Sequence, residues 1–194
     1  MPFVDRTAFA SRSTMNIFSR LTGSSSEESD DSEMSAQDSK TSLLFVCMGN
    51  ICRSPTAEGV FRHLATDAGI IKSLTVDSAG THAYHVGEPP DRRSREAAAR
   101  RGYSLDAIRA RRVAEADFQR FDLILAMDRL NLETLRASSD AAQHAKLRLF
   151  LDYGSSSESE VPDPYYGGAT GFERVLDLIE DASESLLAEI RRGL

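Results

Sequence analysis

The chain has 194 residues, of which 41% are hydrophobic and 27% are charged, and its formal net charge is −7. This negative charge disfavours general binding to nucleic acids, and no apolar run of about 18 residues is present that could cross a membrane. Two cysteines are too few for a disulfide-stabilised scaffold and fit a cytoplasmic protein in a reducing compartment.

Residues 1–40 differ in composition from the rest of the chain. Residues 23–39 are rich in serine and acidic residues and contain almost no apolar side chains, so we expect residues 1–40 to form a disordered N-terminal extension. Residues 1–22 carry arginines, serines and scattered apolar residues, which leaves open an amphipathic segment, an organelle transit peptide or a plain tail. A translation start at Met15 or Met34 is a further alternative.

Residues 41–194 are expected to form a single domain, long enough to bury a hydrophobic core. Apolar runs alternate in it with segments of helical periodicity. Because strands that alternate with helices usually form a covered parallel sheet, the pattern predicts an α/β fold with a four-stranded parallel sheet and helices on both faces. The predicted strands are residues 43–47, 73–77, 122–126 and 147–151, and the predicted helices are residues 55–68, 91–102, 113–120, 129–137 and 171–191.

The segment that follows the first predicted strand has the features of a phosphate-binding loop. It begins at Cys47, and Gly49 allows the backbone to turn and to approach a ligand closely. Ser54 suits the N-cap of the next helix and Pro55 suits its first position. A loop that enters a helix in this way points backbone N–H groups and the positive end of the helix dipole at an anion. In this loop Arg53 adds a planar fork that can hold two phosphate oxygens.

Cys47 is predicted to be the nucleophile that attacks phosphorus. The field that attracts phosphate also favours a thiolate over a thiol. A lone cysteine after a buried strand is more often a core residue, but the spacing to Arg53 favours catalysis. A nucleotide-binding P-loop is excluded because the Gly-Lys-Ser/Thr ending is missing, and the spacing of cysteine and histidine does not suit zinc. We therefore expect no metal and no cofactor.

Arginine is frequent between residues 92 and 112. We expect these arginines to form a solvated face, with the steering of phosphorylated substrates as the alternative.

A second candidate segment is residues 161–168, where Asp163 stands between two prolines. Prolines restrict their own backbone and extend the residue before them, so a surface turn is the simplest interpretation. However, expelling a tyrosine oxygen, whose phenol has a pKa of about 10, requires a proton donor. Asp163 on a rigid loop could donate that proton.

Residues 46–55 resemble, almost residue for residue, the signature of the low-molecular-weight protein tyrosine phosphatase family, and the resemblance covers about residues 42–192. It implies hydrolysis of phosphotyrosine-bearing proteins through a phosphocysteine intermediate. In the implied mechanism Cys47 is the nucleophile, and Arg53 binds phosphate and stabilises the transition state. Asp163, in the Asp-Pro-Tyr-Tyr segment of the family, is the general acid and then the base that activates water.

The resemblance also implies supporting roles. Asn50 is implied to hold a strained backbone through side-chain hydrogen bonds in a network with Ser78, and asparagine tolerates positive φ. Ser54 is expected to bond the Cys47 sulfur, and Asp128 matches a structural acid that could also cap a helix. The other implied contacts to substrate come from loop residues Met48, Gly49, Ile51, Cys52 and Ser54 and from the rim tyrosines Tyr84, Tyr165 and Tyr166, whose rings favour phosphotyrosine over phosphoserine.

One position departs from the family pattern. The family often has a histidine in a His-x-Ala-Arg segment that supports the loop asparagine, and here Ile108 takes that position. We therefore expect one loop hydrogen bond to be absent. The resemblance also implies a reversible Cys47–Cys52 disulfide that protects the nucleophile from over-oxidation, with a plain buried Cys52 as the alternative.

Three other functions share parts of this pattern. An arsenate reductase uses the same loop but normally needs further cysteines, and a phosphoarginine phosphatase has a threonine where this chain has Ile51. A non-catalytic phosphate-binding module would be expected to lose Cys47 or Asp163. The sequence names no physiological substrate, and a monomer or a weak dimer is expected.

Overall fold

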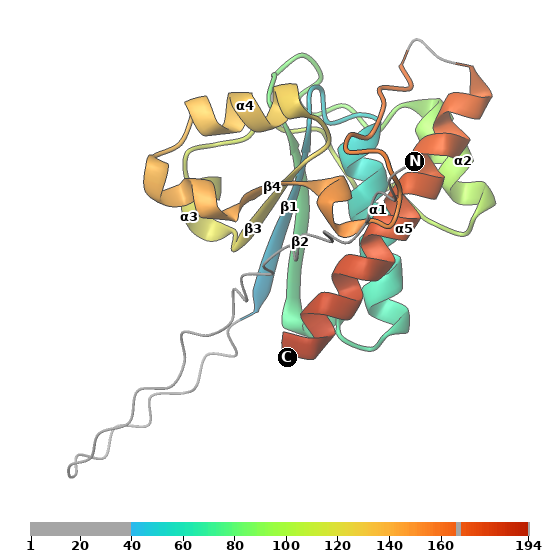
Figure 1. Cartoon of the computed structure of the whole chain (residues 1–194). Helices are drawn as coiled ribbons and strands as arrows, with labels where there is room; N and C mark the ends of the chain where they lie inside the picture. The colour runs from blue at the N-terminus through green and yellow to red at the C-terminus, as the bar shows by residue number, and fades with distance from the viewer. Residues whose placement is uncertain (1–39, 166–167, 194) are drawn as a thin grey trace, which may run out of the picture. The chain divides into compact units, whose positions relative to one another are not determined.

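The computed structural model describes residues 40–165 and 168–193. Its strands are β1 (Thr41–Cys47), β2 (Leu74–Gly80), β3 (Leu123–Ala126) and β4 (Leu147–Leu149). They form one four-stranded sheet in the order β2-β1-β3-β4, in which all neighbours run parallel (Figure 1). The predicted four-stranded parallel sheet is confirmed.

Helices cover both faces of this sheet, as predicted. They are α1 (Arg53–Asp67), α2 (Arg92–Arg100), α3 (Asp117–Arg120), α4 (Arg129–Ala137) and α5 (Ala169–Gly193). The short helices α3 and α4 lie on one face, and α1 and α5 lie on the other face with α2 beside them (Figure 1). Three 3-10 segments complete the described elements: η1 (Ile71–Ser73), η2 (Ala141–Lys146) and η3 (Phe150–Tyr153).

The central strand β1 is apolar from Leu43 to Cys47 because both of its faces are buried there. Leu43 and Phe45 pack into the core under α1 and α5, whereas Leu44 and Val46 pack into the core under α3 and α4. Side chains of a strand alternate between its faces, so a continuous apolar run supplies both cores. The ring of Phe45 meets Phe150 edge to face, with centroids 5.1 Å apart.

The position of β1 also decides where a ligand can bind. β1 lies between β2 and β3. The chain therefore adds β2 on one side of β1 and later adds β3 on the other side. In such sheets ligands bind beyond the carboxyl ends of the strands at the point where the strand order reverses. The loop that follows Cys47 lies at this point.

Four predicted elements are shorter than expected, namely the helices over residues 91–102 and 113–120 and the strands over residues 122–126 and 147–151. The cause is visible for two of them. The helix predicted over residues 113–120 is reduced to α3, because the chain before it is extended: Val113 N–H donates to the Gly80 carbonyl at the end of β2. The strand predicted over residues 147–151 ends at Leu149, because Phe150 begins η3 and turns into the core.

The start of α1 differs from the prediction. The helix begins at Arg53 with Cys52 at its N-cap, so Ser54 is not the cap and Pro55 is the third helical residue. Pro55 is still in the first turn, where backbone N–H groups lack helical partners and a missing N–H costs little. The Ser54 hydroxyl is thereby released for contacts with the loop that precedes the helix.

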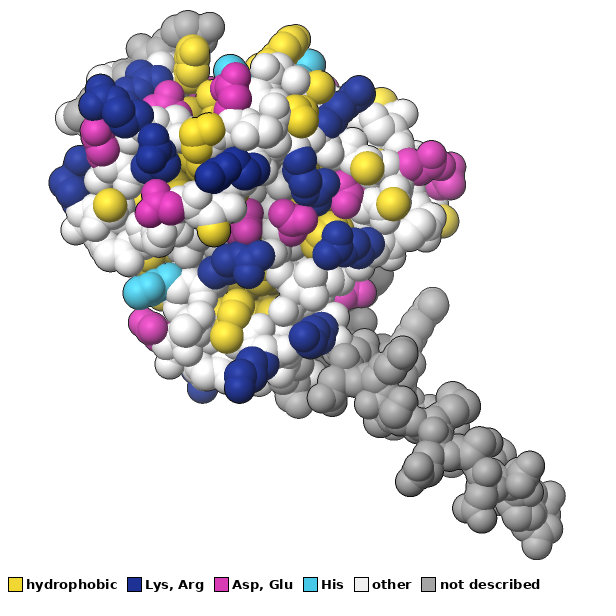
Figure 2. All heavy atoms as spheres, turned by 180° about the vertical axis from the view of Figure 1, so that it is seen from behind, with side chains coloured by type: hydrophobic (Ala, Val, Ile, Leu, Met, Phe, Trp, Pro, Cys, Tyr) yellow, Lys and Arg dark blue, Asp and Glu magenta, His cyan; other side chains and the backbone are white. Residues whose placement is uncertain are grey.

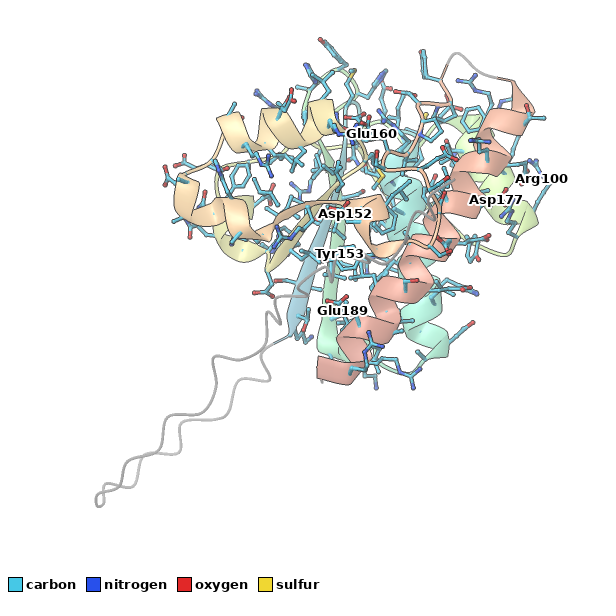
Figure 3. All side chains as sticks on the ribbon, in the orientation of Figure 1. Arg100, Asp152, Tyr153, Glu160, Asp177 and Glu189 are labelled. Carbon is cyan, nitrogen blue, oxygen red and sulfur yellow. The ribbon has the colours of Figure 1, made fainter. Side chains whose placement is uncertain are left out.

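The arginines between residues 92 and 112 are predicted to form a solvated face. In the structure Arg92, Arg100, Arg109 and Arg112 are exposed, whereas Arg93, Arg95, Arg101 and Arg111 are partly buried. Arg101 binds Glu173, Asp177 and Glu180 and so joins α2 to α5, an interface that Arg100 and Asp177 mark in Figure 3. Basic and acidic side chains are intermingled on the face seen in Figure 2. That interpretation was therefore wrong for Arg101, whose side chain is three-quarters buried.

The predictions for residues 1–39 lie outside the described residues. Among the helices that the structure describes, none is both long enough and apolar enough to span a bilayer.

Candidate active site

A pocket of about 280 Å³ opens at the carboxyl end of β1. It brings together residues from three distant parts of the chain: the loop after β1, the segment after β2 and the segment before α5. Its walls are formed by Cys47, Met48, Gly49, Ile51, Cys52, Arg53, Tyr84, His85, Asp163 and Tyr165.

The Cys47 sulfur lies at the base of this pocket, and Cys47 as a whole is only 3% exposed. The backbone N–H of Asn50 donates to Sγ at 3.3 Å, and the Ser54 hydroxyl lies 3.1 Å from the same sulfur. Both contacts favour negative charge on sulfur when the hydroxyl donates. The release of Ser54 from capping is thus what lets it reach Cys47.

Asn50 shapes the loop. Its φ is 55°, in the left-handed region, so the sharp turn is made at Asn50 and not at Gly49. Its side-chain amide donates to Ser54 Oγ and Ser78 Oγ, both at 2.9 Å, and its carbonyl accepts from the backbone N–H of Arg111 at 2.9 Å. The amide is therefore fully engaged without a contribution from the apolar Ile108.

The end of β2 braces the same loop. Thr81 N–H donates to the Cys47 carbonyl and His82 N–H donates to the Met48 carbonyl, at 2.9 and 3.0 Å. At Gly80 an added Cβ would lie 2.7 Å from the Met48 carbonyl oxygen. Only glycine allows this approach, so Gly80 contributes to the loop although it does not line the pocket.

Glu58 completes the network and was missed by the sequence analysis. It lies on α1, is 5% exposed, and accepts hydrogen bonds from Ser78 Oγ at 2.7 Å and from Arg62 Nε at 2.9 Å. Burial raises the pKa of Glu58 above its ordinary value, and the Ser78 and Arg62 contacts only partly offset this. The signal in the sequence was a single acid within the apolar segment of the helix that follows Arg53.

Arg53 is buried, and its guanidinium group spans the pocket. Nη1 donates to Asp128 Oδ2 at 2.6 Å and to the Val161 carbonyl at 3.1 Å, and Nη2 donates to Asp163 Oδ2 at 2.9 Å. Burial alone would lower the pKa of Arg53, but Cys47, Asp163 and Asp128 raise it above its ordinary value. Arg53 thus remains a fixed cation beside the sulfur.

Asp128 caps the following helix, as its place in the sequence allowed, and it also makes a contact with Arg53 that the sequence did not predict. It bonds Arg53, and its Oδ1 accepts the Asn131 N–H at 2.7 Å as the N-cap of α4. One carboxylate therefore orients the arginine and fixes the helix that follows β3.

Asp163 lies on the opposite side of the pocket and its side chain is 45% exposed. Its Oδ1 accepts the Tyr165 N–H at 3.0 Å, a local turn, while its Oδ2 contacts Arg53. Val161 anchors this segment, because its N–H donates to the Met127 carbonyl at 2.8 Å after β3. A carboxyl group is thus held at the mouth of the pocket where water can reach it.

Cys52 and Cys47 are both free cysteines in this structure. Burial raises the pKa of Cys52 to about 12, so Cys52 stays protonated and is a poor nucleophile. The disulfide between the two cysteines stays a prediction.

The rim carries aromatic side chains. Tyr84 is 72% exposed and stacks on His82, with ring centroids 5.2 Å apart and an interplanar angle of 12°. Tyr165 lines the pocket, and Tyr166 lies outside the described residues. His85 also lines the pocket beside Gly49, with its Nδ1 2.8 Å from Glu88. It was missed because nothing in its sequence context distinguishes it.

Comparisons with known proteins agree on one family. The model of the family described as low molecular weight phosphotyrosine protein phosphatase matches residues 42–194. The low molecular weight protein-tyrosine-phosphatase YfkJ of Bacillus subtilis is 44% identical over 152 residues, which cover 78% of this chain and 96% of that protein. The human low molecular weight phosphotyrosine protein phosphatase is 43% identical over 142 residues, which cover 72% of this chain and 89% of that protein.

The chain belongs to the low molecular weight phosphotyrosine protein phosphatase family. Solved structures support the same assignment. A protein tyrosine phosphatase from Entamoeba histolytica, crystallised with Hepes in the active site, superposes with a TM-score of 0.77 at 42% identity, over 79% of this chain and 99% of that one. The B. subtilis YfkJ structure gives a TM-score of 0.75 at 44% identity, over 79% and 96%.

Within the part of this phosphatase-family chain that the structure describes, no group of three or more His, Cys, Asp or Glu side chains could hold a metal ion. The positive charge in the pocket comes from Arg53 and the end of α1.

Proposed function

We propose that the protein hydrolyses phosphotyrosine in proteins to tyrosine and inorganic phosphate through a phosphocysteine intermediate. The supporting observation is the convergence of Cys47, Arg53 and Asp163 on one pocket, although Asp163 is 110 residues from Arg53 in the chain. Membership of the phosphatase family supports the same reaction.

In the first step the Cys47 thiolate attacks phosphorus and the bond to the phenolic oxygen breaks. The transition state carries negative charge on its equatorial oxygens, which Arg53 and the loop N–H groups stabilise without reorganisation. Asp163 donates a proton to the departing phenolate, so tyrosine leaves as a neutral phenol. The position of Asp163 at the mouth of the pocket suits this role, since the leaving group lies outward from phosphorus.

In the second step water attacks the phosphocysteine. Asp163, now ionised, accepts a proton from the water, and the P–S bond breaks to release inorganic phosphate and the Cys47 thiolate. The hydroxyl of Ser54, 3.1 Å from the sulfur, stabilises the departing thiolate. No metal or cofactor takes part in this scheme.

Substrate specificity follows from the depth of the pocket and its rim. The sulfur is buried while Tyr84 and Tyr165 stand at the rim, so a long flat phosphotyrosine side chain can reach the base and a short phosphoserine cannot. We expect a cytoplasmic enzyme that is a monomer or a weak dimer. Ile51 and the two cysteines of the sequence favour this function over a phosphoarginine phosphatase or an arsenate reductase.

The test is turnover of matched phosphotyrosine, phosphoserine and phosphoarginine peptides, with arsenate reduction as a fourth assay. We expect phosphotyrosine to be preferred, and Cys47→Ser to lower its turnover by about 10⁴-fold or more. Trapping of ³²P on Cys47 in single turnover detects the intermediate. An active Cys47→Ser protein, or a preference for phosphoserine, would refute the proposal.

A further inference from the structure

We propose that Arg93, on α2, is a positioning residue that holds the Asp163 loop over the nucleophile loop, an inference that rests on the proposed function. Arg93 does not line the pocket. Its action on the reaction is through the segment that carries Asp163.

The guanidinium group of Arg93 joins two elements. Nε and Nη2 donate to the two carboxylate oxygens of Asp91 at 3.0 and 2.9 Å. The remaining nitrogen, Nη1, donates to the Tyr165 carbonyl at 3.0 Å. A planar guanidinium group can donate hydrogen bonds to a carboxylate and to a carbonyl at once, whereas a lysine ammonium cannot reach both acceptors with the same geometry.

Two aromatic rings hold the same guanidinium group. Its central carbon lies 5.5 Å from the centroid of the Tyr165 ring and 4.8 Å from that of Phe172 in the first turns of α5. Both distances are within the range of cation–π attraction. Arg93 therefore fixes Tyr165 by its carbonyl and by its ring, two residues after Asp163.

Asp91 connects this clasp to the nucleophile loop. Its backbone N–H donates to the Ile51 carbonyl at 2.7 Å, and its side chain caps α2 by accepting the Arg93 N–H at 2.8 Å. The hydrogen bond from Arg93 lowers the pKa of Asp91 below its ordinary value, so Asp91 stays ionised. A continuous path thus leads from Ile51 through Asp91, Arg93 and Tyr165 to Asp163.

The proposed reaction gives this path a role. Arg53 Nη2 contacts Asp163 in the structure, but in the proposed transition state the same guanidinium binds phosphate oxygens. The carboxyl of Asp163 must then be positioned without Arg53. The contacts of Arg93 to Tyr165 lie outside the phosphate site, so they persist when phosphate binds.

The test measures kcat on aryl phosphates whose leaving phenols range from strongly acidic to as basic as tyrosine. We expect Arg93→Met to lower kcat about tenfold for the basic phenols and less than about twofold for the acidic ones, because only basic phenols need the proton. Arg93→Lys keeps the charge without the fork and should fall between Met and wild type. The matched control is Arg92→Met: Arg92 is the adjacent residue, is 77% exposed and pairs with Glu96, and we expect no change with leaving group.

A double variant separates positioning from general damage to the fold. If Arg93 acts through Asp163, Arg93→Met should cost nothing further on basic phenols in an Asp163→Ala background. An equal loss on all phenols, or a full tenfold further loss in the double variant, would overturn the proposal. If the loss of kcat depends on the leaving group in Asp163→Ala but not in Arg93→Met, the role proposed for Arg93 is overturned and the proposed function stays intact. If the loss of kcat depends on the leaving group in neither variant, the assignment of Asp163 as the general acid is overturned, and the role of Arg93 falls with it.

Discussion

The two sides of the pocket are built differently. The nucleophile side, residues 47–54, is buried and its polar groups are bonded to one another and to β2 and α1. The acid side, residues 161–165, is partly exposed and is held by an anchor at Val161, a local turn and two arginines, Arg53 and Arg93.

This difference indicates which part of the reaction each side controls. The network around Asn50 fixes the positions of the sulfur and the loop N–H groups before any ligand binds, which is the condition for electrostatic stabilisation of a transition state. In the mechanism we propose, Asp163 in contrast gives up its contact with Arg53 when phosphate binds. We therefore expect changes on the nucleophile side to affect all substrates and changes on the acid side to affect only those with poor leaving groups.

The largest of the effects expected here comes from Arg53→Lys. Lysine keeps the charge but cannot donate to Asp128, Val161 and phosphate in the same plane, so we expect kcat/KM to fall by about 10²- to 10³-fold for every aryl phosphate. Steady-state kinetics with good and poor leaving groups measure this. Arg129→Lys is the control, because the Arg129 side chain is 64% exposed and contacts Glu160 and Ser159. A loss confined to poor leaving groups would contradict the division between the two sides.

A smaller and selective effect is expected from Asp163→Asn. Asparagine keeps an acceptor for the Tyr165 N–H but cannot donate the proton of a carboxylic acid, so kcat should fall about 10²-fold for basic phenols and little for acidic ones. Because Asp163 is half exposed, thermal unfolding should change little. The exposed Asp152, on η3, supplies the control Asp152→Asn. Equal losses across the series would show that Asp163 acts by charge alone.

The same contrast explains what the sequence could and could not predict. The strands were predictable because β1 from Leu43 onward and β3 are apolar on both faces, and β2 and β4 have apolar residues at alternate positions. The loop from Cys47 to Arg53 was recognisable from the local spacing of its residues. The prediction that Ser54 caps the helix was wrong. Its position before a proline indicated a cap, but its hydroxyl instead contacts the Cys47 sulfur and accepts a hydrogen bond from Asn50.

Residues that act through long-range packing were not predictable in this way. Glu58 contacts Ser78, and Arg93 contacts Tyr165, which is 72 residues away. The local signal is weak for both side chains, since Glu58 is a single acid within an apolar stretch of its helix and Arg93 is one arginine among many. Their roles appear only when α1 is packed on β2 and α2 is brought to the segment before α5.

The smallest effect is expected from Glu58→Gln, which asks whether the nucleophile side needs a charge or only a hydrogen-bond acceptor. The glutamine carbonyl can still accept from Ser78, so kcat should fall less than about threefold. The pH dependence of stability should change more clearly. Burial raises the pKa of Glu58, so the folded protein retains a proton that the unfolded chain has released.

The resulting contribution to stability is fully present below the ordinary glutamate pKa of about 4.3 and is lost as the pH rises through the raised value. Glutamine does not titrate, so the unfolding free energy of the wild type relative to Glu58→Gln should decrease as the pH rises. Urea unfolding at a series of pH values measures this, with Glu96→Gln on the exposed face of α2 as the matched substitution away from the loop. If the unfolding free energy of the wild type relative to Glu58→Gln instead grew with pH, ionised Glu58 paired with Arg62 would be what supports the loop. The nucleophile side would then depend on charge, as the acid side does.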